Sequence, residues 1–145
     1  MSPGPNLTIR LSHRFRATPE RVFDAWLDPA TVGRWLFATP TGKMVRVEID
    51  PRVGGFYTIV ECRNGEDAVH FGMYLEIDRP RRLVFTLGAE KDSQAMDPIV
   101  IEILPTDTGG ELTLTHTLQP KWAEYRDRTE QGWTSILEGL AGTLG

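Results

Sequence analysis

Three histidines, one cysteine and several carboxylates are the residues of this 145-residue chain whose side chains could take part in chemistry. His13, His70, His116 and Cys62 show neither the paired histidines at i and i+4 nor the CxxC spacing that is typical of a metal site. No Gly-x-Ser-x-Gly motif marks a nucleophilic serine, and Gly54-Gly55 precedes a predicted strand, whereas a phosphate loop precedes a helix. The sequence therefore predicts no metal, no cofactor and no nucleophile.

A set of aromatic residues indicates a different kind of site, an apolar pocket. Such a pocket is lined mostly by aromatic and aliphatic side chains, with a few polar groups that orient the ligand. The same aromatic side chains could equally fill a solid core, and the sequence alone leaves both interpretations open. The set consists of Trp26, Trp35, Tyr57, Phe71, Tyr74, Phe85 and Trp133.

Composition and charge exclude several classes of protein. The chain is 40% hydrophobic and 25% charged with a formal net charge of −4, and it has no run rich in Lys and Arg. It therefore lacks the basic surface that nucleic acid or an anionic membrane requires. No segment has the length of a membrane span, no secretory signal is evident, and a single cysteine suits a reducing compartment. We expect a cytoplasmic chain with a flexible tail over residues 1–6 and one domain over residues 7–145.

The first third of the chain predicts one strand and two short helices. Residues 7–15 alternate between apolar and polar side chains, which is typical of a half-exposed strand. Thr18-Pro19 then supplies an N-cap followed by proline at the first helical position. Asp28-Pro29 repeats this start signal, which predicts a second short helix that ends at about Leu36.

The middle of the chain predicts an antiparallel sheet. Asn64-Gly65 is the strongest hairpin signal, and further turn residues separate the other apolar segments. Because consecutive hairpins make antiparallel neighbours, we expect a meander of six or seven strands. The polar residues 88–98 show no periodicity and are interpreted as a mobile loop at a rim. After the first strand, the expected strands are 44–49, 56–62, 69–77, 83–87, 99–103 and 112–116.

The chain ends in a predicted long helix that starts at about Trp122. One side of this helix is apolar and must cover another surface, which the sheet provides. The fold class is therefore α+β, with a curved antiparallel sheet wrapped on the C-terminal helix and two short helices after the first strand. The apolar side consists of Trp133, Ile136, Leu137, Leu140 and Leu144.

Small residues form a second face of the same helix. Gly132, Ser135, Gly139 and Gly142 lie close together there, although each glycine within a helix costs about 0.5–1 kcal/mol relative to alanine. Three interpretations remain open: tight packing against the protein's own short helices or sheet, contact with a second copy in a homodimer, or room for a ligand.

Six stretches together resemble a known family. The stretches are TPERVFDAW at 18–26, GGFY at 54–57, GMYLEI at 72–77, RLVFT at 82–86, LTLTH at 112–116 and QGWTSIL at 131–137. With these stretches in this order, the sequence resembles the helix-grip fold of the START-like, polyketide cyclase/dehydrase-type superfamily and, within it, the heat-shock protein 90 ATPase activator homologue family.

This resemblance implies a deep cavity between the concave sheet face and the long helix, open at one end. It places Glu61 and Glu76 inward on neighbouring strands together with His116, although alternation alone would also allow the opposite face to point inward. Apart from the resemblance, Trp35 and the stretch 37–39 after it are expected to form a movable lid, because a short helix followed by a loop has few contacts that hold it. The residues implied to line the cavity are Trp26, Trp35, Tyr57, Ile59, Glu61, Tyr74, Glu76, Phe85, Ile101, Leu114, His116, Trp133 and Leu137.

The function expected from this resemblance is the binding of a small apolar or amphipathic molecule between sheet and helix. One alternative is a co-chaperone-like interaction with a chaperone in the stress response. Another is an enzyme like the cyclases and dehydratases that share the fold, using Glu61, Glu76 or His116 as acid or base. Those three side chains could instead be satisfied by the backbone, by each other or by solvent.

Overall fold

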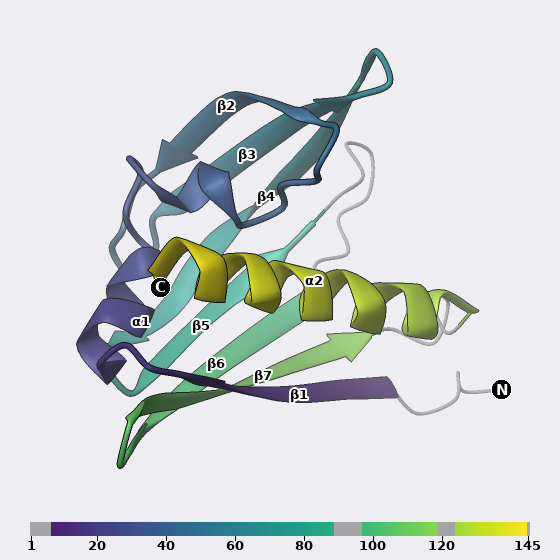
Figure 1. The fold of residues 1–145 in the computed structure, drawn as a ribbon. Coiled ribbons are helices and arrows are strands. Elements are labelled where there is room, and N and C mark those ends of the chain that lie inside the picture. Colours follow the sequence, from purple (N-terminus) through teal and green to yellow (C-terminus); the bar gives the residue numbers. More distant parts are fainter. Residues whose placement is uncertain (1–6, 89–96, 119–123, 145) are drawn as a thin grey trace, which may run out of the picture.

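The predicted meander forms a single antiparallel sheet of seven strands in the order β1-β7-β6-β5-β4-β3-β2 (Figure 1). The computed structural model describes residues 7–88, 97–118 and 124–144, so the expected tail 1–6 lies outside the described residues. The elements are β1 Leu7–Phe15, α1 Pro19–Ala25, η1 Val32–Arg34, β2 Lys43–Ile49, β3 Phe56–Arg63, β4 Glu66–Asp78, β5 Arg82–Leu87, β6 Asp97–Thr106, β7 Gly109–Leu118 and α2 Arg126–Leu144.

The hairpin signal at Asn64-Gly65 is confirmed. Both residues have positive φ, 53° and 83°, which is the backbone of a type I′ turn that matches the twist of the flanking strands. The turn joins β3 to β4, and Arg63 pairs with Glu66 at its base. Glycine and asparagine tolerate this left-handed backbone better than other residues, so the sequence determines the turn locally.

The first short helix is also confirmed, whereas the second is only a 3-10 turn. The Thr18 hydroxyl caps α1 by accepting a hydrogen bond from the backbone N–H of Arg21 at 3.3 Å, with Pro19 at the helix start. After Asp28-Pro29, however, only Val32–Arg34 is helical. The Asp28 carboxylate accepts from the backbone of Ala30 and from the Thr31 hydroxyl, so it supports a tight turn that does not continue as an α-helix.

The loop expected over residues 88–98 does not extend to Pro98. Asp97 and Pro98 already belong to β6, where they pair with Leu87 and Thr86 of β5. Pairing of β6 with β7 begins only at Ile99, so Pro98 lacks a strand neighbour on that side and breaks no ladder there. The rest of the predicted loop, residues 89–96, lies outside the described residues.

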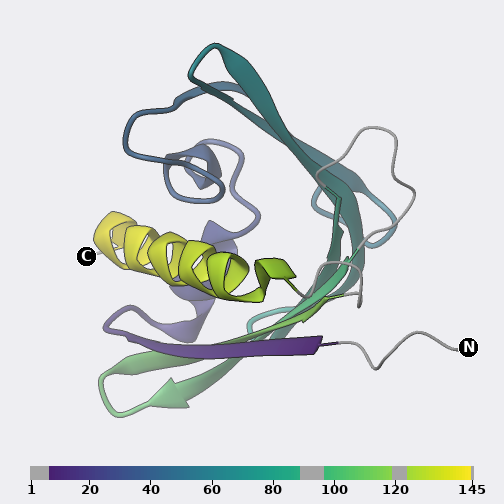
Figure 2. The ribbon, with the colours of Figure 1, turned by 90° about the vertical axis from the view of Figure 1, so that its right-hand side faces the viewer.

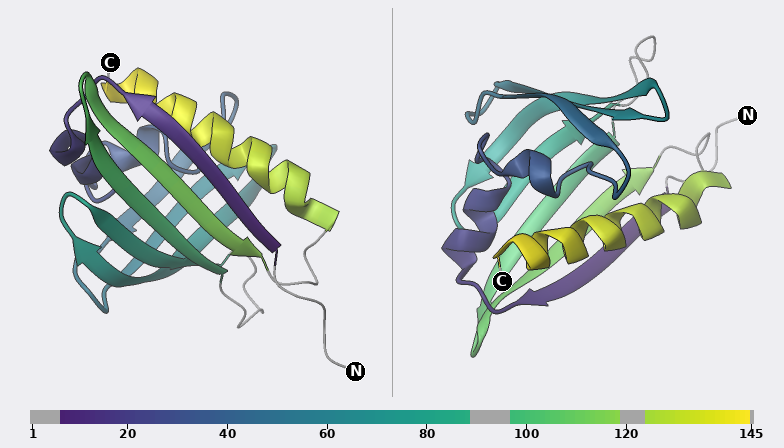
Figure 3. Two further views of the ribbon diagram at one scale, coloured as in Figure 1. Left: turned by 90° about the horizontal axis from the view of Figure 1, so that it is seen from below. Right: turned by 45° about the horizontal axis from the view of Figure 1, so that its top comes forward.

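Helix α2 lies across the concave face of the sheet, as Figures 2 and 3 show. Its predicted apolar side is confirmed, because Trp133, Leu137 and Leu140 are buried and Ile136 and Leu144 pack against the core. The helix starts at Arg126, and the predicted start at Trp122 falls outside the described residues. No helix in the part of the chain that the structure describes is long and apolar enough to cross a membrane.

Aromatic side chains fill the interior at the end of the sheet that α1 covers. Trp26 and Trp35 pack edge to face with 4.7 Å between ring centroids, and Phe85 lies 6.1 Å from Trp26 and 5.7 Å from Tyr57. All four side chains are buried. At this end of the molecule the predicted aromatic set therefore forms a core.

The buried hydroxyl of Tyr57 leads to a testable prediction. It donates a hydrogen bond of 2.7 Å to the Thr86 carbonyl, and burial, with a smaller effect from Tyr74, raises the pKa of Tyr57 well above its ordinary value. Tyr57→Phe keeps the packing and removes this bond, so it should lower the free energy of unfolding by about 1 kcal/mol. Urea denaturation of both proteins would measure this difference, and an unchanged stability would contradict the prediction.

Candidate ligand-binding site

A pocket of about 730 Å³ lies between the N-terminal half of α2, the segment 37–40 and the neighbouring ends of the central strands. Its volume is in the range of pockets that hold drug-sized molecules. Aromatic and aliphatic side chains make much of its wall, and charged or polar side chains interrupt them. The lining residues are Phe37, Ala38, Thr39, Pro40, Arg63, His70, Leu87, Gly88, Asp97, His116, Leu118, Tyr125, Arg128, Thr129, Gly132, Trp133, Ser135 and Ile136.

Three of these side chains form a hydrogen-bonded chain that links α2 to the sheet. The indole Nε1 of Trp133 donates to His116 Nδ1 at 2.8 Å, and His116 Nε2 lies 2.9 Å from Asp97 Oδ2. Trp133 and His116 are only 2% and 3% exposed, so neither is available to water. Both ring nitrogens of His116 are occupied, and the histidine therefore connects two neighbours without offering a free base to the pocket.

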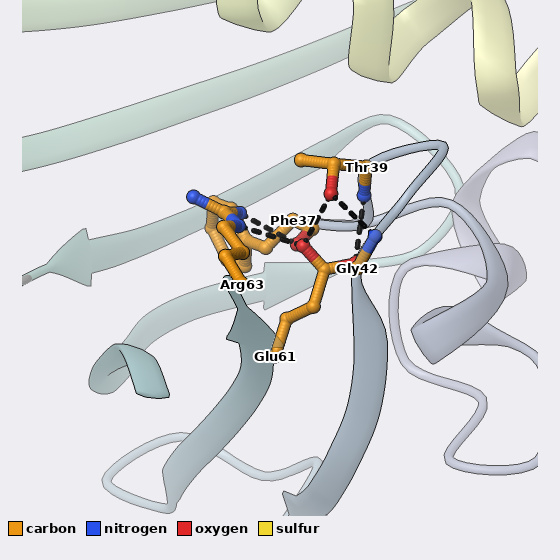
Figure 4. Close-up of polar contacts among 5 residues, drawn as sticks. All are labelled: Phe37, Thr39, Gly42, Glu61 and Arg63. Atoms are coloured by element: carbon orange, nitrogen blue, oxygen red, sulfur yellow. Dashed lines mark hydrogen bonds and ion pairs between the residues drawn. The ribbon is translucent and has the colours of Figure 1, made fainter. Parts of the chain in front are cut away.

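A buried carboxylate attaches the segment 37–42 to β3 (Figure 4). Glu61 accepts hydrogen bonds from the Thr39 backbone N–H at 2.7 Å and the Thr39 hydroxyl at 2.8 Å, and from Arg63 Nε at 2.6 Å. Burial raises the pKa of Glu61, but the bonds from Arg63 and Thr39 outweigh it, so the pKa is lowered. Gly42 lies so close to the carboxylate that a Cβ there would collide with it.

Arg63 extends this attachment to the pocket wall. Besides Glu61, it donates to the Phe37 carbonyl at 3.0 Å, and Phe37 adopts a positive φ of 59° that a large side chain seldom takes. The Phe37 ring stacks on His70 with 4.2 Å between centroids and an interplanar angle of 3°. Burial, and next the nearby Arg63, lower the pKa of His70 to about 4, so this imidazole is neutral at neutral pH.

The structure brings only two of the residues implied by the resemblance to this pocket, His116 and Trp133. The Trp35 side chain is buried in the core and does not line the pocket, whereas Phe37, Ala38 and Thr39 do. Glu61 is buried beside the pocket and holds the segment 37–42 instead of facing a ligand. The remaining apolar members lie in the core: Trp26, Trp35, Tyr57, Ile59, Tyr74, Phe85, Ile101, Leu114 and Leu137.

The inward position expected for Glu76 is wrong. Its side chain is 46% exposed and pairs with Arg82 at 3.1 Å on the outer face of the sheet. A bulge between Tyr74 and Glu76 puts one extra residue into β4, so Tyr74 and Ile77 face the core whereas Glu76 pairs with the outward Val84. Glu61, Glu76 and His116 therefore do not share one enclosure.

The structure adds residues to the site that the sequence reasoning missed. His70 and Asp97 both line the pocket. His70 belongs to no recognised motif, and Asp97 was assigned to the loop predicted over residues 88–98. The glycine-rich face of α2 did carry a signal: Gly132 and Ser135 line the pocket, and a Cβ at Gly132 would meet nothing within 4 Å. A Cβ at Gly139 would lie 3.6 Å from Trp35, so this glycine packs against the protein's own chain.

A curved antiparallel sheet closed by a C-terminal helix, with a short helix after the first strand, defines the START-like helix-grip class. Solved structures share this arrangement. Protein CV1439 from Chromobacterium violaceum is 31% identical, with 97% of this chain and 98% of that chain covered and a TM-score of 0.81. Protein SA2116 from Staphylococcus aureus, described as of unknown function, is 21% identical, with 96% and 93% covered and a TM-score of 0.84.

The chain belongs to the family described as Activator of Hsp90 ATPase homolog 1-like protein, whose model matches residues 16–145. This match confirms the family that the six sequence stretches resemble. A comparison with curated proteins found no match. The family match and the solved structures establish the fold and the relationship.

Proposed function

We propose that this protein binds a small, largely apolar molecule in the pocket at the N-terminal half of α2. The observation that carries the proposal is the pocket itself, about 730 Å³ in volume and lined by Phe37, Leu87, Trp133 and Ile136 among others. Apolar surface of a ligand buried against such walls contributes about 25 cal/mol per Å². Binding and release of a ligand, as in a carrier or sensor, is the activity that this proposal assigns to the chain.

Two hydrogen-bonded groups support a site that is formed before ligand arrives. Glu61 and Arg63 hold the segment 37–42, and Trp133 is fixed to His116, so two walls of the pocket are held by buried polar contacts. A wall that is already ordered costs less conformational entropy on binding than one that must be ordered by the ligand. The proposal therefore includes a largely preformed site.

Filling the pocket from the helix tests this function. Gly132→Leu places a side chain into the space next to Gly132, so we expect the affinity for the neutral fluorescent probe N-phenyl-1-naphthylamine to fall at least about tenfold. Gly142→Leu is the matched control, because Gly142 lies on the same helix, has nothing within 4 Å of its Cβ position and does not line the pocket. Fluorescence titration would measure both affinities.

The two variants also separate binding from stability. Leucine forms helix better than glycine, so each substitution should raise the free energy of unfolding by up to about 1 kcal/mol. A loss of probe affinity in Gly132→Leu alone, in a protein at least as stable as the parent, would support the pocket. An equal affinity in all three proteins, or no probe binding by the parent, would contradict the proposal.

A second candidate function is an interaction with a chaperone, which the description of the family favours. Phe56 and Leu75 are 65% and 47% exposed, and Phe56 lies on the face of the sheet opposite to the buried Tyr57. Apolar side chains on an outer face are a feature of protein-binding surfaces. Stimulation of a heat-shock ATPase by the purified chain, reduced in Phe56→Ser, is the result expected under this candidate function.

A further inference from the structure

The hydrogen-bonded chain Trp133–His116–Asp97 has a fixed direction. An indole Nε1 can only donate, so His116 Nδ1 must accept and carries no proton. In the neutral imidazole the proton then resides on Nε2, which donates to Asp97 Oδ2. Trp133 and His116 are both buried, and Trp133 is held in α2 while His116 is held in β7. These two hydrogen bonds therefore fix the orientation of the Asp97 carboxylate in the pocket.

Within residues 7–88, 97–118 and 124–144, the Asp97 carboxylate has acceptor positions that no side chain fills. A carboxylate offers about four acceptor positions, and among the described residues His116 is the one side chain that donates to it. The Asp97 side chain is 15% exposed, and no Lys or Arg of the described ranges forms an ion pair with it. A carboxylate that is largely removed from water is stabilised by further hydrogen-bond donors. A ligand in the pocket can supply such a donor.

The other charged groups at the pocket limit which kind of hydrogen-bond donor a ligand can bring to Asp97. Arg63 is paired with the buried Glu61, and Arg128 has its guanidinium 5.9 Å from the centroid of the Tyr125 ring on the exposed side of α2. Besides the paired Arg63 and Glu61, Arg128 and Asp97 place one charge of each sign at the pocket, so these charges balance and favour neither a cationic nor an anionic ligand. A neutral hydroxyl group can donate to Asp97 without disturbing this balance of charge.

From this geometry we infer that Asp97 recognises the polar end of the ligand, and that the ligand is a neutral molecule with an apolar body and a hydroxyl group. This inference rests on the proposed function, because it concerns the same pocket. The apolar body would lie against Phe37, Leu87 and Ile136, and the hydroxyl would donate to the free oxygen of Asp97. Trp133 and His116 act as positioning residues for that carboxylate.

A pair of probes with one ring system, of which one has a hydrogen-bond donor and the other has that donor methylated, tests the inference. 2-Naphthol and 2-methoxynaphthalene share the same rings, but only the first can donate a hydrogen bond. A hydrogen bond to a charged acceptor should make the wild-type protein prefer 2-naphthol by roughly ten- to a hundredfold. In Asp97→Asn, the side chain can accept from His116 and then presents its NH₂ group, so the preference should fall to about onefold while 2-methoxynaphthalene binds as before. Isothermal titration calorimetry would measure both affinities.

Trp133→Phe tests the positioning role separately. It keeps an aromatic wall but removes the donor that fixes the proton of His116 on Nε2, so the preference for 2-naphthol should fall although Asp97 is unchanged. If Asp97 and Trp133 serve only the fold, both variants would weaken the two probes by the same factor, and the inference would be wrong. Circular dichroism would check that each variant is folded.

The outcomes also distinguish this inference from the proposed function. If the wild-type protein binds both probes with equal affinity, the pocket binds apolar molecules but Asp97 does not select among them. If 2-naphthoate binds better than 2-naphthol, the polar end is recognised by Arg63 or Arg128 and the assignment to Asp97 is overturned. If neither naphthalene binds, both the pocket proposal and this inference fail.

Discussion

Gly72→Ala is expected to lower the free energy of unfolding by at least about 3 kcal/mol. A Cβ at this position would collide with the Thr86 carbonyl oxygen, and it would lie 2.7 Å from the Thr86 carbonyl carbon and 2.9 Å from Tyr57 Cε1. The first two atoms belong to the backbone of a neighbouring strand, so they cannot move aside as the end of a flexible side chain can. Gly72 thus leaves the space in which the Tyr57 hydroxyl reaches the Thr86 carbonyl.

Thermal and urea denaturation would measure this loss. For a chain of this length each 1 kcal/mol shifts the melting temperature by about 2–4 °C, so a decrease of roughly 6–12 °C is expected. Gly132→Ala is the matched control, since nothing lies within 4 Å of its Cβ position and the added methyl group should stabilise the helix by up to about 1 kcal/mol. A Gly72→Ala protein within 1 kcal/mol of the parent would show that the sheet relaxes around the methyl group.

Glu61→Gln should destabilise the protein by about 2–4 kcal/mol at neutral pH. The substitution keeps the size of the side chain but removes the negative charge that Arg63 Nε and the two Thr39 donors share. Glu61 is only 1% exposed, so water cannot replace the contacts that its carboxylate makes. Arg63 is partly exposed, so solvent compensates in part for the contact that its guanidinium loses when the negative charge is removed. Glu76→Gln is the matched control, because its ion pair with Arg82 is on the surface and should contribute less than about 1 kcal/mol.

The effect of Glu61→Gln should depend on pH in a defined direction. The pKa of Glu61 in the folded protein is lowered, so its contribution is complete above the unfolded pKa of about 4.3 and is lost as the pH falls through the folded value. The stability difference between the parent and Glu61→Gln should therefore shrink below about pH 4. Burial lowers the pKa of His70 to about 4, and the charge of Glu61 raises it, so the difference also contains the smaller change in His70 that follows from removing Glu61. Urea unfolding at several pH values measures it, and a difference that grows toward low pH would contradict the role assigned to Glu61.

Much of the candidate site could not be predicted from the sequence because its members come from distant segments. His70 and Phe37 stack although they are far apart in the chain, and no local pattern indicates a contact between a loop residue and the middle of a strand. Asp97 was assigned to a loop because residues 88–98 are polar and show no periodicity. Its position opposite Leu87 follows from strand pairing, which brings it to His116.

The sequence by itself determined most of the elements and their order, but not the 3-10 turn at Val32–Arg34 or the start of β6 at Asp97. Alternation in β1, the Thr18-Pro19 start of α1, the Asn64-Gly65 turn and the apolar side of α2 are all local patterns, and local backbone preferences and side-chain periodicity are enough to produce them. The family resemblance followed from the same stretches and was confirmed.

The tertiary structure alone decided which side chains meet in the pocket. A bulge in β4 turns Glu76 to the outer face, and hydrogen bonds from Thr39 and Arg63 make Glu61 an attachment for the segment 37–42. The physical reason is that a shift of one residue in strand register reverses which side chains face inward, and this register depends on pairing between strands along the whole sheet.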